Sequence, residues 1–261
     1  MKNISLYTYF GFKTLLHYRL RHSRVIWHPC TPKSASSYLT RILEKLLIPE
    51  FSTGDPVPFF GNRRQEPCIF SINAQMGFKK KYYSGHLHTL YTDFFKKKFM
   101  NEKSFAIVQT RDLKDTLVSM LDHDRDHKTP PGPFRVGNPQ QWARLDDEEK
   151  LAIIIVNYVP FHIDFLQSWA SCPKAYRVNF NDVTSSPVEV VREICSYTKI
   201  DRSEEQISEA VDFVSQGDAK NYLFNKGISG RGNSISEKNK HLIKMIISSL
   251  NFSLNSDLDL N

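Results

Sequence analysis

Residues 25–47, VIWHPCTPKSASSYLTRILEKLL, constrain the fold more than any other part of the sequence. They predict a strand at residues 24–28, a turn of small hydroxylated residues with one lysine, and an amphipathic helix at residues 34–47. A helix that follows a strand in this way directs its first backbone N–H groups at the space above the sheet edge, where they and the helix dipole stabilise an anion. The segment therefore predicts a strand–loop–helix phosphate site like that of P-loop proteins.

Strands and helices are expected to alternate along the rest of the chain, with a loop at residues 51–67. The other predicted strands are residues 68–73, 81–84, 105–110 and 175–180; the other predicted helices are residues 88–99, 112–123, 146–170, 186–199, 203–215 and 236–250. Pro160 is expected to kink or split the long helix. Alternation of this kind is typical of a parallel sheet with helices on both faces.

The predicted fold class is therefore α/β: a central, mainly parallel β-sheet flanked by helices. Residues 1–261 are expected to form a single domain, in which residues 1–24 are an N-terminal extension and residues 124–145 a surface excursion.

Composition restricts the ligand and the compartment. The net charge of +7 favours an anionic ligand or surface. The four cysteines show no metal-type spacing, which indicates reduced thiols in a cytoplasmic protein. No transmembrane segment is predicted, although the aromatic and basic N-terminus leaves a weak peripheral membrane contact open.

The loop departs from the ordinary P-loop pattern, which has a glycine immediately before the lysine. Pro32 occupies that position, and no glycine occurs between Phe12 and Thr53. A nucleoside triphosphatase is therefore disfavoured. The simplest alternative is that Ser34 caps the helix and Lys33 is solvated.

Two later segments carry groups suited to anions. Arg111 follows the predicted strand at residues 105–110, and Ser119 lies eight residues on, roughly 12 Å along a helix. The alternative is that Arg111 pairs with Asp112 or Asp115 while Ser119 faces solvent. Residues 225–232, NKGISGRG, contain three glycines that allow close backbone approach to a ligand, or else form a flexible basic loop.

Together these segments resemble the sulfotransferases that use 3′-phosphoadenosine 5′-phosphosulfate (PAPS). Residues 32–38, PKSASSY, are similar to the family's 5′-phosphosulfate loop, PKSGTTW, and Arg111 and Ser119 match its 3′-phosphate pair. Residues 179–182 with Pro187 are similar to the YEDL-type strand end, and residues 226–230 to the late RKGxxG loop. The resemblance extends over residues 25–239.

The resemblance implies PAPS as donor, adenosine 3′,5′-bisphosphate (PAP) as product, and no metal. This sequence departs from the family's pattern at four positions. Ala35 replaces a glycine, Tyr38 a tryptophan, Phe180 a tyrosine and Asn225 an arginine; Arg231 is a candidate substitute for that arginine. The cofactor-binding residues implied are Pro32, Lys33, Ser34, Ala35, Ser36, Ser37, Tyr38, Arg111, Ser119, Phe180, Lys226, Gly227 and Arg231.

Two residues are predicted to be catalytic. Lys33 is expected to stabilise the leaving phosphate with a mobile point charge. Residues 82–87, YYSGHL, resemble the family's K-T-H-L-P segment, which implies that His86 is the base, with Ser84 in place of the lysine. An unperturbed imidazole titrates near about 6.5 and so is available as a base at neutral pH. His88 is a weaker candidate, and a purely structural histidine is the alternative.

The predicted function is transfer of a sulfuryl group to a hydroxyl on a glycan, a lipid or a small-molecule alcohol or phenol. Residues 51–73, 88–99 and 122–144 are expected to line the acceptor pocket. A P-loop nucleotide kinase with Asp112 at Mg²⁺ is the first alternative. A polyanion-binding module that uses the lysine runs at residues 79–81 and 96–98 is the second, although nucleic acid is not expected as a partner. The sequence leaves the oligomeric state open.

Overall fold

The computed structural model describes residues 23–47, 50–53, 81–127, 139–216 and 228–250. Within these ranges a five-stranded sheet has the order β2–β3–β1–β4–β5, and every neighbouring pair is parallel. The strands are β1 (Arg24–Pro29), β2 (Ser52–Thr53), β3 (Lys81–Leu87), β4 (Ser104–Thr110) and β5 (Ala175–Asn179). The predicted α/β fold with a parallel sheet is confirmed.

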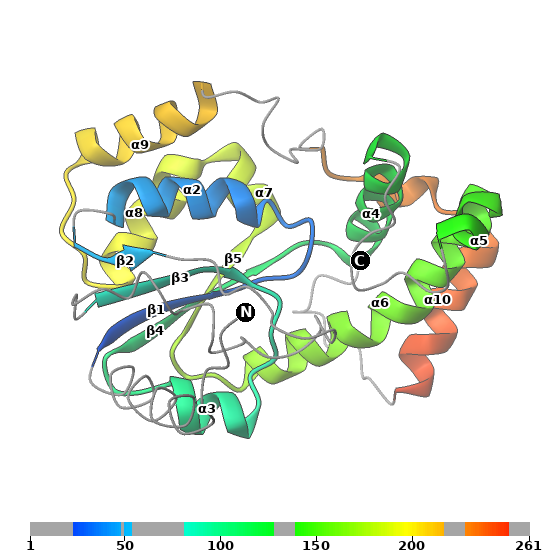
Figure 1. Ribbon diagram of the computed structural model, residues 1–261, viewed down its shortest axis with the longest axis horizontal. Helices are drawn as coiled ribbons and strands as arrows, with labels where there is room; N and C mark the ends of the chain where they lie inside the picture. Colours follow the sequence, from blue (N-terminus) through cyan, green and yellow to red (C-terminus); the bar gives the residue numbers. More distant parts are fainter. Residues whose placement is uncertain (1–22, 48–49, 54–80, 128–138, 217–227, 251–261) are drawn as a thin grey trace, which may run out of the picture.

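Helices cover both faces of the sheet (Figure 1). On one face lie α2 (Ser36–Leu47), α8 (Pro187–Tyr197) and α9 (Glu204–Gln216); on the other lie α3 (Asp93–Phe99) and α6 (Asp147–Ala170). The remaining helical elements are α4 (Leu113–His127), α5 (Pro139–Arg144), α7 (Phe180–Ser185), the 3₁₀ turn η2 (Arg231–Ser234) and α10 (Glu237–Ser249).

Strand β1 shows why the sheet needs both layers. Alternate residues of a strand point to opposite faces. Trp27 belongs to an apolar cluster with α3, α4, α6 and α10, whereas Ile26 belongs to a second cluster with α2, α8 and α9. Both side chains are almost completely buried, so β1 lies at the centre of the molecule.

Helix α6 is the longest element, and its start is sequence-encoded. Asp146 and Glu149 form a reciprocal capping box, which satisfies two of the N–H groups that have no partner within the helix. The helix continues through Pro160 and is not split. By length and composition alone α6 is apolar enough to cross a membrane, but it packs against α4 and α10 as a core helix.

Two sequence predictions are wrong in part. Residues 88–92 are not helical, because Thr92 caps α3 by accepting a hydrogen bond from the Phe95 amide. Residues 124–145 are not simply a surface excursion: α4 continues to His127, and Trp142 of α5 is buried with its indole N–H donated to Asp124. The predicted strand at residues 68–73 and the N-terminal extension up to residue 22 lie outside the described residues.

Candidate active site

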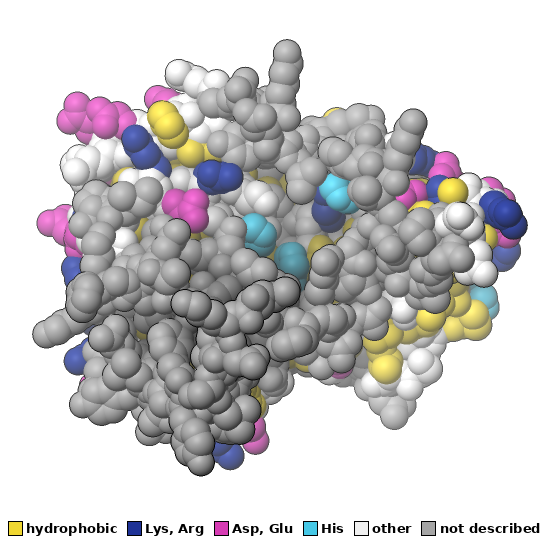
Figure 2. Space-filling model, viewed as in Figure 1, with side chains coloured by type: hydrophobic (Ala, Val, Ile, Leu, Met, Phe, Trp, Pro, Cys, Tyr) yellow, Lys and Arg dark blue, Asp and Glu magenta, His cyan; other side chains and the backbone are white. Residues whose placement is uncertain are grey.

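The predicted functional residues meet at the carboxyl end of the sheet. Lys33 follows β1, His86 lies near the end of β3, Arg111 follows β4 and Phe180 follows β5. The carboxyl ends of parallel strands are where open α/β sheets bind ligands. In Figure 2 histidine side chains are visible near the centre of the face, over this end of the sheet.

The loop between β1 and α2 has an unusual backbone. Lys33 and Ala35 have φ values of 61° and 64°, in the left-handed region that an L-residue rarely adopts. Ala35 therefore has the backbone conformation that favours glycine, the residue found there in related loops. The alternating conformation forms a nest, in which successive backbone N–H groups turn toward one concave side.

The carbonyl groups of this loop turn inward and are satisfied by the protein. Gln109 Nε2 donates to the Ser34 carbonyl at 2.5 Å, and Arg111 Nη1 donates to the Lys33 carbonyl at 3.0 Å. The Thr31 carbonyl accepts the Ser34 hydroxyl at 2.6 Å. With these acceptors occupied and the first N–H groups of α2 lacking intrahelical partners, the loop presents donors to a ligand.

The other loop residues differ in what they present. Pro32, Ser34 and Ser36 are buried, while Ser37 is exposed. The Ser34 hydroxyl is directed at Thr31, so it neither caps α2 nor faces a ligand. Tyr38 is half-buried, with its hydroxyl 2.8 Å from the Ser215 hydroxyl of α9.

Arg111 is buried between the loop and the start of η2. Its Nη2 donates to the Ile228 carbonyl at 2.8 Å, and its guanidinium lies 3.8 Å from the centre of the Phe180 ring. Burial lowers the pKa of Arg111, and the nearby Asp115 carboxylate partly offsets this. Phe180 thus acts as a platform for Arg111, which restricts the direct contact that was predicted between this ring and the cofactor.

Ser119 lies on α4, two turns beyond Arg111. It is 1% exposed, and its hydroxyl has no hydrogen-bond partner among the described residues. The alternative is therefore wrong for Ser119, which does not face solvent, but it is confirmed for Arg111, whose Nη2 lies 4.0 Å from the Asp115 carboxylate. A buried hydroxyl without a partner is costly, so it indicates a position that a ligand satisfies.

The late glycine loop is held against α4 by carboxylates. Asp115 accepts the backbone N–H of Gly230 at 2.8 Å and of Gly232 at 2.7 Å. A Cβ on Gly232 would lie 2.3 Å from the Lys114 Cβ, so this glycine is required by close packing. The Arg231 guanidinium forms an ion pair with Asp122, one turn beyond Ser119. Lys226 and Gly227 lie outside the described residues.

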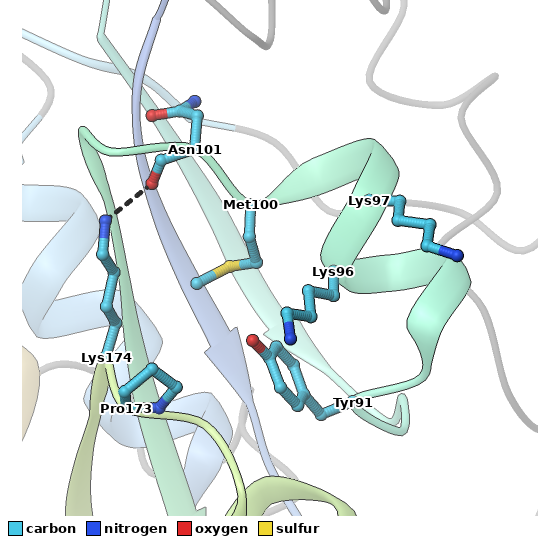
Figure 3. A pocket seen from close by; sticks show the side chains of 7 residues that line it. All are labelled: Tyr91, Lys96, Lys97, Met100, Asn101, Pro173 and Lys174. Atoms are coloured by element: carbon cyan, nitrogen blue, oxygen red, sulfur yellow. Dashed lines mark hydrogen bonds between the residues drawn. The ribbon is translucent and has the colours of Figure 1, made fainter.

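Two cavities lie at opposite ends of the sheet. One of about 320 Å³ lies between the start of α4, the β5–α7 junction and residues 229–233, and is lined by Arg111 and Phe180. A larger and more open one, of about 710 Å³, lies near the amino ends of β4 and β5 (Figure 3). It is lined by three lysines, one of which, Lys174, donates to the carbonyls of Asn101 and Glu102. Its size does not make it the active site: Tyr91, Lys96 and Lys97 come from a segment predicted to line the acceptor pocket, but none of the predicted catalytic or cofactor-binding residues lines this cavity.

His86 reaches the α2 side of the sheet through a β-bulge. Ile26 pairs with Tyr83 but His28 pairs with His86, so β3 has one extra residue there. Gly85, with φ of 66°, supplies the left-handed conformation of such a bulge. In a regular strand Tyr83 and His86 would face opposite sides. The bulge turns both toward α2, and His86 Nδ1 lies 3.4 Å from the Thr40 hydroxyl.

His88 is less suited to act as the base. Its Nδ1 is 2.8 Å from the Cys30 carbonyl, which ties the ring to the end of β1. Burial and the neighbouring His86 lower its pKa to about 4. Among the described residues no group of three or more His, Cys, Asp or Glu side chains is arranged to hold a metal ion.

Comparisons with known proteins agree with this site. The family profile described as the sulfotransferase domain matches residues 30–249, which is most of the chain. The chain therefore belongs to the sulfotransferase family. This confirms the predicted class of enzyme, a PAPS-dependent sulfotransferase, and disfavours the kinase and polyanion-binding alternatives.

Solved structures share the fold. Mouse sulfotransferase SULT7A1, crystallised with PAP, has a TM-score of 0.64 at 16% identity over 94% of this chain and 90% of that one. Retinol dehydratase in complex with androsterone and the inactive cofactor PAP has a TM-score of 0.59 at 12% identity, over 96% of this chain and 87% of that one. A comparison with curated protein sequences finds no significant match.

Proposed function

We propose that the protein transfers the sulfuryl group of PAPS to a hydroxyl acceptor, with the donor bound across the β1–α2 loop and α4. The observation that carries this proposal is the β1–α2 loop, whose Thr31, Lys33 and Ser34 carbonyls are hydrogen-bonded within the protein and whose left-handed Lys33 and Ala35 give it the conformation of a nest. The unpartnered hydroxyl of Ser119 supports it, because the donor carries a second phosphate.

The residues present fit the two ends of this donor. The nest formed by residues 32–37 suits the 5′ end, and Tyr38 is placed to offer a ring face. Arg111 and Ser119 suit the 3′-phosphate. Arg231 lies close enough to Arg111 to lower its pKa and can join them if its pairing with Asp122 is shared. Lys226 and Gly227 keep their predicted role.

When bound, PAPS supplies an activated sulfuryl group on a phosphate that is a good leaving group. Lys33, beside the nest, stabilises negative charge at the leaving phosphate, because a positioned cation acts most strongly where charge develops. His86 accepts the proton of the acceptor hydroxyl. His86 and Lys33 therefore act on opposite partners of the transfer.

Three finer points belong to the same proposal. The reaction is metal-independent, because Lys33, Arg111 and the loop amides supply the positive field. The acceptor is a small molecule, a lipid or a glycan; the complexes of structural neighbours with androsterone and retinol favour a lipophilic alcohol. The protein acts in the cytoplasm, as the free, buried Cys30, Cys172 and Cys195 suggest.

Thermal-shift measurements with PAP, and with ATP or ADP plus Mg²⁺, test donor binding. A ligand at 100 times its dissociation constant stabilises the folded state by about 2.7 kcal/mol. We expect PAP to give this stabilisation. We also expect transfer of labelled sulfate to a panel of hydroxyl acceptors, both with and without EDTA. Stabilisation by ATP with Mg²⁺ but not by PAP would overturn the proposal, and loss of transfer in EDTA would overturn metal independence.

Replacement of His86 by alanine tests the base. We expect sulfate transfer to fall by about 10²–10⁴-fold, the range for a positioned general base, while PAP still raises the melting temperature. The matched control is His88→Ala, which we expect to retain most activity. Equal loss in both variants would remove the special role assigned to His86.

A further inference from the structure

A chain of buried polar side chains links the phosphate loop to His86. Gln109 Nε2 donates to the Ser34 carbonyl, and Gln109 Oε1 lies 2.8 Å from His28 Nε2. His28 Nδ1 lies 2.7 Å from the Tyr83 hydroxyl. The Thr40 hydroxyl lies 3.3 Å from His28 Nδ1, 3.4 Å from the Tyr83 hydroxyl and 3.4 Å from His86 Nδ1.

Four members of this chain are almost inaccessible to solvent. His28, Gln109 and Tyr83 are 0% exposed, and Thr40 is 4% exposed. They come from β1, β4, β3 and α2, so no single element explains their meeting. Polar groups that are this deeply buried cost free energy unless they are hydrogen-bonded, and a satisfied network of this kind fixes orientation.

The donors and acceptors of the chain can be assigned in sequence. The Gln109 amide group is used by the Ser34 carbonyl, so its oxygen faces His28, and His28 Nε2 must carry the proton. Burial lowers the pKa of His28 to about 3, so the ring is neutral and Nδ1 is an acceptor. The hydroxyls of Tyr83 and Thr40 both lie within hydrogen-bond distance of this acceptor.

Thr40 closes the chain at the catalytic end. The Tyr83 hydroxyl donates to the Thr40 oxygen at 3.4 Å, and the Thr40 proton is directed at His28 Nδ1, 3.3 Å away. A lone pair of the Thr40 oxygen is then left for His86 Nδ1. The contact is long, as hydrogen bonds at catalytic groups often are before substrate binds.

We propose that Thr40, held by Tyr83, His28 and Gln109, is the positioning residue for His86: it accepts the Nδ1–H and so leaves the Nε2 lone pair for the acceptor hydroxyl. When the acceptor proton moves to Nε2, the imidazolium keeps its Nδ1–H on Thr40. This inference rests on the proposed function. It adds that the phosphate loop and the base are parts of one hydrogen-bonded structure.

Two histidines among the described residues interact electrostatically with His86: His28 of β1 and His88 of β3. His88 Nδ1 is itself bound to the Cys30 carbonyl, and burial raises the pKa of the Cys30 thiol to about 12. Burial keeps both neighbouring histidines neutral, and the contact that the described residues make with His86 Nδ1 is the neutral hydroxyl of Thr40.

The test uses Thr40→Val, which keeps the shape and removes the hydroxyl, and Thr40→Ser, which keeps the hydroxyl. Thr198→Val is the matched control: Thr198 is also fully buried, but its hydroxyl donates to the Ile194 carbonyl at the end of α8. We expect kcat to fall roughly 10-fold or more in Thr40→Val, part of the 10²–10⁴-fold that a positioned base supplies. Thr40→Ser should recover most of it, and Thr198→Val should match the wild type.

A readout without PAPS separates positioning from stability. Long-range ¹H–¹⁵N NMR of the histidine rings distinguishes the two neutral tautomers. We expect wild type and Thr40→Ser to show His86 protonated at Nδ1, and Thr40→Val to show a mixture. Tyr83→Phe, which leaves Thr40 in place but removes its support, should give an intermediate spectrum and an intermediate kcat.

The outcomes distinguish the two proposals. Absence of PAP binding and of sulfate transfer in the wild type would defeat the proposed function itself. An active wild type with an equally active Thr40→Val would defeat only the positioning role. An Nε2-protonated His86 in the wild type would also overturn it, because Thr40 would then be the donor.

Discussion

The β1–α2 loop and the contact between α4 and η2 both prepare the protein for an anion, but side-chain donors, including the Arg111 guanidinium, hold the first in place and carboxylates hold the second. Around the loop, Gln109 and the Ser34 hydroxyl satisfy backbone carbonyls. At α4, Asp115 and Asp122 occupy the N–H groups and the guanidinium that a phosphate would use.

The difference shows that the two phosphate-bearing ends of PAPS would bind to sites of different kinds. The loop is preorganised, so a phosphate finds its donors already aimed and pays little for reorganisation. In the α4–η2 contact, by contrast, a phosphate must share Arg231 with Asp122. We therefore expect the loop to govern catalysis and the α4–η2 contact to govern affinity for the 3′-phosphate and its sensitivity to salt.

The largest expected effect is at the loop. Lys33→Met removes the charge and keeps much of the side-chain length, and we expect kcat to fall about 10²–10³-fold, as for loss of one preorganised charge-stabilising donor. PAP affinity should change much less. Lys33→Arg, which keeps the charge, is the control; equal activity in Lys33→Met and wild type would remove Lys33 from the mechanism.

Ser119→Ala tests the other region. A hydrogen bond to a charged group contributes about 1.5–3 kcal/mol, so PAP affinity should fall by roughly 10-fold to 100-fold. The unliganded protein should be no less stable than wild type, because the hydroxyl has no described partner there. Calorimetric titration with PAP and with adenosine 5′-phosphate would measure this. The loss should appear only for the ligand with the 3′-phosphate.

Gly232→Ala tests how closely η2 packs against α4. The new methyl group would meet Lys114 at 2.3 Å, so we expect the free energy of unfolding to fall by about 1–3 kcal/mol. Gly230→Ala is the control, since nothing lies within 4 Å of a Cβ there and only its φ of 81° opposes the change. A larger loss in Gly230→Ala, measured by urea unfolding, would show that backbone strain outweighs packing.

Acid should lower the stability of the folded protein through protonation of His28. Its pKa is about 3 in the folded protein and about 6.5 when unfolded, so the unfolded state binds a proton that the folded state excludes. The free energy of unfolding should therefore fall as the pH falls from about 6.5 toward 3, by up to about 1.4 kcal/mol per pH unit from this residue. His28→Gln should show a shallower slope in unfolding experiments across this range, and an unchanged slope would contradict the assignment.

Ala35→Gly is the smallest change. An L-residue in the left-handed conformation costs about 1–2 kcal/mol, and the greater freedom of glycine in the unfolded chain returns part of it. We expect a rise of about 1 kcal/mol or less in stability, with PAP affinity almost unchanged. A loss of affinity would show that the Cβ of Ala35 contributes to the shape of the nest.

Local patterns allowed much of the fold to be predicted. The apolar run at residues 105–110 and the capping acids at residues 146–149 gave β4 and α6, and the order of the segments gave the parallel sheet. Helix α7 was missed because it is short: Asn179 ends β5 and immediately caps the next turn. Trp142 was missed because its partner, Asp124, lies in a segment that looked polar.

For the site, sequence reasoning identified residues that lie in the loops themselves, but it missed groups that act through distant contacts. Asp115 is 115 residues from Gly230, and nothing local links them. His28 and Gln109 looked like ordinary strand residues, since their role depends on three other elements. The glycine at position 85 was visible, but its bulge was not, because a bulge is a property of strand pairing.

Because of the bulge in β3, the side of the sheet that His86 faces depends on how many residues separate it from Tyr83. Strand residues face one side or the other according to whether their number is odd or even relative to a neighbour, and the extra residue at Gly85 reverses this parity. A change at Gly85 that removed the bulge but kept the residue would turn the His86 ring toward the opposite layer, whereas deletion of Gly85 would leave His86 two residues beyond Tyr83 and on the same side of a regular strand. The orientation of the predicted base therefore depends on how β3 pairs with β1 at Gly85, as well as on the residue at position 86 itself.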